Sequence, residues 1–168
     1  MTDGTSMSPR DVFVLKQERI SELDADGQAE LFAEDGVLEV PFATDGMPNR
    51  FVGRETIRAV TAAALENAKR GTRRLVAHLD EVIYVTDDPE VVVAEFLSQT
   101  EDTVTGERFQ APYIQVLRIR DGKIVLFRDY CTLDAITHLW GANGGESFAG
   151  LGRTSPGGPP QESPPGGA

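Results

Sequence analysis

Asp129 is the residue whose position most favours chemistry, because it shares one face of an expected strand with Val125 and Phe127. Alternate residues of a strand point to the same side of a sheet, so this carboxyl group would stand among apolar side chains. Burial raises the pKa of a carboxyl group, which can then give or take a proton near neutral pH. Two ordinary arrangements compete with this interpretation: an ion pair with Arg128 or another arginine, and a position at a solvated rim.

Three polar residues on neighbouring strands could assist Asp129. Tyr113 and Gln115 share one face of the preceding strand, and antiparallel pairing would bring that face beside Asp129. Their hydroxyl and amide groups could donate hydrogen bonds to a substrate carbonyl, or both could be satisfied core residues. Ser98 could hold a water molecule or a substrate oxygen, or could simply be a small strand residue.

The other chemically active side chains have simpler explanations. His78 is expected to be a packing or surface residue. His138 is expected to face the pocket mouth or solvent, and Lys16 to be a solvated residue of the first helix. Cys131 lacks a cationic or histidine partner in the pattern, which favours an inert small residue over a nucleophile. The sequence has no glycine-rich phosphate loop, Cys-x-x-Cys pair or His-x-x-x-His spacing. We therefore expect no cofactor and no metal.

Length and charge restrict the class of protein. The 168 residues suffice for one domain of ordinary size. Sixteen Lys+Arg and 27 Asp+Glu residues give a formal net charge of −11, which argues against binding to nucleic acid or to a membrane surface. No apolar run resembles a membrane span or a secretory signal, so a cytoplasmic protein is expected. Proline and glycine concentrate near the end, which predicts a domain over 9–140 between disordered segments at 1–8 and 141–168.

The periodicity of apolar residues predicts helices first and strands afterwards. Helical spacing occurs at about 9–24, in a short segment with Ala29, Leu31 and Phe32, and at about 54–69 and 133–140. Alternation with period two occurs at about 37–42, 74–85, 90–100, 107–119 and 123–131. This order indicates an α+β domain whose curved antiparallel sheet wraps over the N-terminal helices. Several strands are apolar on both faces, so a second copy of the chain is expected to cover the outer sheet face.

Four segments of this sequence carry a resemblance to a known family: Leu31–Val37, Phe51–Ile57, Val116–Ile124 and Phe127–Tyr130. They look like the SnoaL-like branch of the nuclear-transport-factor-2-like superfamily, over about residues 10–140. Thr86–Pro89 and the last helix are similar to the phenazine-biosynthesis PhzA/PhzB proteins. The resemblance implies a cystatin-like or ketosteroid-isomerase-like cone with one deep apolar pocket, usually in a homodimer. This shape hosts many reactions and does not by itself name one.

The catalytic sets of the resembled enzymes match this chain poorly. Epoxide hydrolases of the limonene-epoxide type use five polar groups, which would fall on Leu38, Val40, Phe96, Ser98 and Asp129. Only Asp129 has the required type.

Ketosteroid isomerases and SnoaL-like cyclases offer a second comparison. The isomerase base would fall on Val40 and its acidic donor on Gln115, and its first-helix tyrosine falls near Lys16. SnoaL-like cyclases place an aspartate where Asp129 stands and a histidine where Gln115 stands. The PhzA/PhzB proteins have a glutamate at the position of Asp129, which is thus the functional position that agrees in most comparisons.

These observations predict a cofactor-independent enzyme of natural-product biosynthesis, in which Asp129 transfers a proton during cyclisation, isomerisation or dehydration. Its substrate would be a small, apolar, oxygenated, polyketide-like metabolite, with Tyr113 and Gln115 polarising a carbonyl. The expected substrate-binding wall consists of Leu38, Val40, Phe42, Phe96, Ser98, Leu117 and Phe127. Two alternatives stay open: an epoxide hydrolase, and a non-catalytic module for ligand binding or assembly.

Overall fold

The computed structural model describes residues 7–43, 47–140 and 151. In chain order its elements are α1 (Pro9–Ser21), α2 (Ala25–Glu30), β1 (Phe32–Glu39), β2 (Arg50–Val52), α3 (Arg54–Arg70), β3 (Arg73–Val85), β4 (Val91–Asp102), β5 (Arg108–Arg120), β6 (Lys123–Cys131) and α4 (Leu133–Trp140). The disorder predicted for 1–8 and 141–168 falls almost wholly outside the described residues. None of the helices in this part of the chain has the length and apolarity that a membrane crossing requires.

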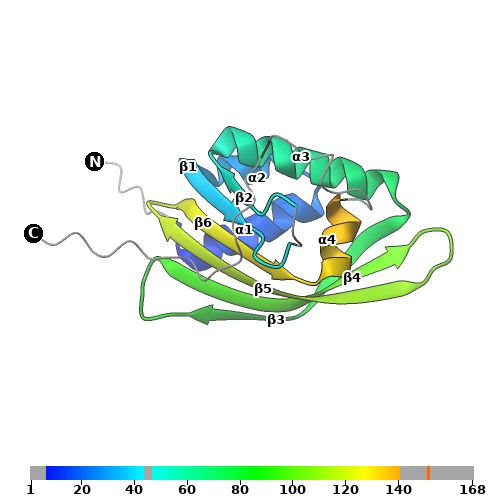
Figure 1. Cartoon of the computed structure of the whole chain (residues 1–168). Helices are drawn as coiled ribbons and strands as arrows, with labels where there is room; N and C mark the ends of the chain where they lie inside the picture. Colours follow the sequence, from blue (N-terminus) through cyan, green and yellow to red (C-terminus); the bar gives the residue numbers. More distant parts are fainter. Residues whose placement is uncertain (1–6, 44–46, 141–150, 152–168) are drawn as a thin grey trace, which may run out of the picture.

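One curved sheet organises the described part of the chain. Its strand order is β2-β1-β6-β5-β4-β3, and neighbouring strands are antiparallel except for the parallel pair β1 and β6. Figure 1 shows the helices on the concave side of the sheet, with α4 at one end between α3 and the sheet. The predicted α+β class, with a sheet wrapped over the N-terminal helices, is confirmed. The parallel pair was not predicted.

The first strand differs most from the sequence prediction. The helix-like spacing placed Phe32 in a helix and the strand at 37–42, whereas β1 runs from Phe32 to Glu39. The register between β1 and β6 shifts after Phe32, and Gly36 lies in this irregular stretch. A Cβ atom on Gly36 would lie 2.9 Å from the Ile124 carbonyl oxygen, so the close approach of the two backbones requires glycine.

Helix α1 carries a lysine into the interior of the domain. It begins with a capping box, in which the Ser8 hydroxyl accepts from the Asp11 N–H and the Asp11 carboxylate accepts from the Ser8 N–H. Val12, Phe13 and Lys16 of this helix are buried. Because Val12 and Lys16 are four residues apart, they lie on the same side of the helix, and that side faces the sheet.

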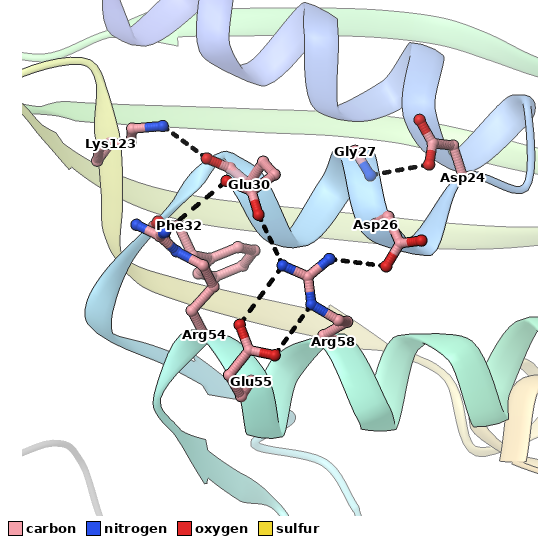
Figure 2. Close-up of polar contacts among 9 residues, drawn as sticks. All are labelled: Asp24, Asp26, Gly27, Glu30, Phe32, Arg54, Glu55, Arg58 and Lys123. Atoms are coloured by element: carbon pink, nitrogen blue, oxygen red, sulfur yellow. Dashed lines mark hydrogen bonds and ion pairs between the residues drawn. The ribbon is translucent and has the colours of Figure 1, made fainter.

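An ion-pair network joins α2 to α3 (Figure 2). Arg58 of α3 donates to Asp26 and Glu30 of α2 at 2.7 Å each, and to Glu55 of its own helix at 3.2 Å. Lys123 of β6 donates to the Glu30 carbonyl oxygen at 2.7 Å. Partly exposed pairs are individually weak. Together these ion pairs hold α2 against α3.

Candidate active site

A cavity of about 210 Å³ lies between the concave sheet face and helices α1, α3 and α4. Its wall is mainly apolar, and five of the seven predicted wall residues contribute to it: Leu38, Val40, Phe96, Ser98 and Phe127. A concave, mainly apolar cavity with a few inward-facing polar groups is the usual form of a small-molecule site.

The structure places the other two predicted wall residues elsewhere. Phe42 lies beyond the end of β1, is 62% exposed, and packs edge-on against the Tyr130 ring with centroids 5.4 Å apart. Leu117 lies on the predicted face of β5 but is fully buried in the core and does not reach the cavity. Alternation predicts the face of a strand that a residue occupies, but neither where the strand ends nor how deep the residue lies.

Asp129 of β6 faces the cavity and is held by Gln115 of β5. The two residues are directly opposite in the strand register, and Gln115 Nε2 donates to Asp129 Oδ1 at 2.9 Å. Burial raises the pKa of Asp129, while the positive charge of Lys16 and the hydrogen bond from Gln115 oppose that rise. Arg128, the alternative partner, donates instead to Glu39 at 2.9 Å. Among the described residues no other group hydrogen-bonds to the Asp129 carboxyl group, which leaves its second oxygen for a ligand.

Tyr113 lies in the same wall, two residues before Gln115 on β5. Its ring stacks on that of Phe96, with centroids 5.3 Å apart and an interplanar angle of 2°. Burial and the nearby charge of Asp129 raise the pKa of the Tyr113 hydroxyl well above its usual range. Tyr113 therefore stays protonated at neutral pH and can donate a hydrogen bond.

Lys16 of α1 lines the cavity, although the sequence pattern did not predict it there. The prediction of a solvated side chain is wrong, because Lys16 is 2% exposed and lines the cavity. Its Nζ donates to Gln17 Oε1 at 2.9 Å and lies 4.8 Å from the centroid of the Phe127 ring. Burial lowers the pKa of Lys16 from its ordinary 10.5 to about 8, although Asp129 and Glu81 raise it. Two signals could have found it: its spacing from Val12, and its match to the tyrosine position of the isomerases.

The two histidines also line the cavity. His138 was expected at the pocket mouth or in solvent, whereas His78 was expected to be a packing or surface residue. Gln17 Nε2 donates to His78 Nδ1 at 3.3 Å, and burial together with the charge of Lys16 lowers the pKa of His78 to about 4. Burial likewise lowers the pKa of His138. Cys131 is buried outside the cavity wall, and burial raises its pKa. His78 is thus a neutral ring at pH 7, and Cys131 is an unreactive thiol.

Three cationic side chains, Lys69, Arg73 and Arg74, line the end of the cavity near α4. Arg73 Nη1 lies 3.1 Å from Asp134 Oδ2, and its guanidinium group stacks 3.7 Å above the Phe109 ring. Arg74 donates to backbone carbonyl groups at the end of α3, as a cation at a helix C-terminus is expected to do. Lys69 pairs with Glu66 at 2.9 Å, so Arg74 is the cation at this end that has no carboxylate partner among the described residues.

A curved sheet that encloses a helix-covered cavity is the architecture of the nuclear-transport-factor-2-like cones, which include the ketosteroid-isomerase-like folds. A family model of the SnoaL-like domain matches residues 11–127, which is more than half of the chain. The protein therefore belongs to the SnoaL-like family, as the sequence motifs predicted.

Individual relatives agree with this assignment. A PhzA/B-like protein of Pseudomonas aeruginosa, itself uncharacterised, is 36% identical over 143 residues, which cover 85% of this chain and 96% of the relative. A candidate isomerase of Bacillus subtilis of known structure is 26% identical, with a TM-score of 0.65 over 82% of this chain and 98% of that one. A candidate polyketide cyclase of Pseudomonas putida, at 20% identity, has a TM-score of 0.58 over 77% of this chain and 95% of that one, which shows the shared fold.

Proposed function

We propose that this protein is a cofactor-independent enzyme in which Asp129 transfers protons to and from a small carbonyl compound. The observation that carries the proposal is the Asp129 carboxyl group in the wall of an apolar cavity, with Gln115 donating to one of its oxygens. The family and the names of its solved relatives, a candidate isomerase and a candidate polyketide cyclase, support an enzyme of the isomerase or cyclase kind.

The proposed reaction begins with removal of a proton from the carbon next to the substrate carbonyl. Asp129 accepts this proton on its free oxygen and returns it at another carbon, or the enolate closes a ring. Tyr113 is the proposed hydrogen-bond donor to the developing oxyanion. Gln115 is proposed as a positioning residue, because one N–H of its Nε2 group holds Asp129 Oδ1, while its second N–H can donate to the substrate oxygen.

The cavity also suggests the kind of substrate. Its volume of about 210 Å³ suits a small metabolite rather than a long chain. At one end, Arg74 has no carboxylate partner among the described residues, and its positive charge would attract an acidic group. We infer a substrate with a ketone at the Asp129 end and an acidic group at the cationic end. A cytoplasmic location remains a prediction.

A homodimer through the outer sheet face is the second part of the proposal. Val82, Tyr84 and Ile114 lie on the face opposite the cavity and are exposed. No helix covers this face in the described part of the chain (Figure 1). Burying these side chains against a second copy would remove apolar surface from water.

The function is tested by Asp129→Asn. Exchange of solvent deuterium into cyclohexenone and tetralone, followed by mass spectrometry, reports enolisation without knowledge of the natural substrate. The variant should lose about a hundredfold to ten-thousandfold in enzyme-dependent exchange, because its amide cannot accept the proton. Asp121→Asn, a matched change in the exposed β5–β6 turn, should retain full activity. Undiminished exchange by Asp129→Asn would remove Asp129 from the mechanism, and tight probe binding without exchange by the native protein would favour a binding module.

A further inference from the structure

The amino group of Lys16 is unusual for a lysine because it is buried and because its neighbours are mainly apolar. It lines the cavity, is 2% exposed, and forms no salt bridge among the described residues. Its Nζ contacts one neutral oxygen, Gln17 Oε1 at 2.9 Å, and lies near the rings of Phe127 and Phe13, at 4.8 and 5.4 Å from their centroids. A lysine amine that is desolvated in an apolar pocket is the form that attacks carbonyl carbons.

We propose that Lys16 forms a covalent imine with aldehydes or ketones that enter the cavity. This goes beyond proton transfer by Asp129: it requires the cavity to admit a carbonyl compound, but it does not require Asp129 to enolise it. The ligand class is a small aldehyde or ketone, with or without an acidic group for the cationic end.

The reaction balances with the groups present in the cavity. The neutral Lys16 nitrogen adds its lone pair to the carbonyl carbon, and one of its protons passes to the oxygen, which gives a carbinolamine. Protonated Asp129 then supplies a proton to the hydroxyl group, which leaves as water. The products are an iminium cation on Lys16, a carboxylate on Asp129 and one water molecule. The products carry one positive charge on Lys16 and one negative charge on Asp129, which are the same charges that these residues carry when both are ionised.

The surroundings of Lys16 suit both partners of this reaction. A pKa of about 8 leaves roughly 300-fold more neutral amine near pH 7 than the ordinary value of 10.5 does. The Phe13 and Phe127 rings would flank the iminium cation and stabilise it. His78 Nδ1 accepts from Gln17 Nε2, which turns Gln17 Oε1 toward Lys16 and fixes the position of the amine.

The chain has three lysines, Lys16, Lys69 and Lys123, which makes the test direct. The native protein is incubated at pH 7 with benzaldehyde and sodium cyanoborohydride, which reduces an imine to a stable secondary amine. Peptide mapping by mass spectrometry then locates the adduct. We expect Lys16 to carry at least about tenfold more adduct than the solvent-exposed Lys123, because far more of its amine is neutral. Labelling of Lys16 should reach half of its maximum rate near pH 8.

Matched variants separate this proposal from the proposed function. Lys16→Arg should lose the adduct, whereas Lys123→Arg should keep it at Lys16. Asp129→Asn should slow labelling of Lys16 without moving it to another residue, even if deuterium exchange proves independent of Asp129. Labelling spread over the exposed lysines of the native protein, with Lys16 unmodified, would overturn the proposal, and this readout requires no variant to fold.

Discussion

Lys16 and Asp129 lie in one cavity wall, and each has a pKa displaced toward that of the other. Burial lowers the pKa of Lys16 to about 8 and raises the pKa of Asp129. Each charge partly restores the ionisation of the other. The free energy that separates the ionised pair from the neutral pair is therefore smaller than it is for two solvent-exposed groups. Groups with pKa values shifted in this way are typical of sites that move protons.

The Lys16→Met variant tests this balance through stability. The folded pKa of Lys16, about 8, lies below its unfolded value of 10.5. Between these values the unfolded state binds more protons, so the native protein should gain stability as pH rises from about 8 to 10.5, by ~3 kcal/mol from this group. Met has a similar volume but does not ionise, so burying it carries no cost from a buried charge. The variant should therefore be more stable than the native protein at pH 7.

The measurement is urea unfolding of both proteins at several pH values, compared as a difference. Asp129, His78 and Glu81, which surround Lys16 on β6 and β3, are present in both proteins. The raised pKa values of Tyr113 and Cys131 lower the stability as pH rises. Both residues are present in both proteins, so their contributions largely cancel in the difference. A difference in unfolding free energy that stays constant from pH 7 to 10.5 would show that Lys16 keeps an ordinary pKa.

At the scale of elements, the sequence predicted the long strands and α3 closely. In each of them the spacing of apolar residues repeats several times with the period of a strand or of a helix. The prediction failed at β1, where the spacing of Phe32 fits a helix and pairing with β6 decides otherwise. Phe42 was assigned to the cavity because alternation was extended past the end of this strand. Lys16 was misplaced because charge was taken as a sign of exposure. Its spacing from Val12 indicates the buried side of α1, but the cavity that receives its amino group is formed by distant helices and strands, which the local pattern does not contain.

The element-scale prediction concerns Gly36 in the irregular stretch of β1. In Gly36→Ala, the new methyl group would lie 2.9 Å from the Ile124 carbonyl oxygen and 3.1 Å from that of Ala33. Both atoms belong to backbone, so β1 and β6 must separate, at a cost of about 1–3 kcal/mol. Chemical denaturation measures the loss. Gly71→Ala is the control, since its nearest atoms lie at 3.7 Å or beyond, and equal stability of the two variants would contradict the close approach.

At the scale of the whole molecule, the sheet has two faces with different tasks. The concave face and the helices enclose the cavity, and their packing uses most of the large apolar side chains. The opposite face exposes Val82 and Tyr84 of β3 and Ile114 of β5, which lie on either side of Glu95 of β4 in the strand register. A net charge of −11 keeps copies of the chain apart at long range, so association through this face depends on local apolar contact and should strengthen with salt.

Ile114→Lys tests the proposed dimer, because it places a charge in the middle of the outer face, where Ile114 is 46% exposed. Sedimentation equilibrium should show a dimer for the native protein and a shift toward monomer for the variant, with the native dimer tightened by added salt. Val104→Lys is the control, since Val104 is an exposed apolar residue in the β4–β5 turn and lies away from this face. Because Ile114 points away from the cavity, deuterium exchange per chain should persist in the monomer. A native protein that is monomeric at all concentrations would refute the interface while leaving the Asp129 site intact.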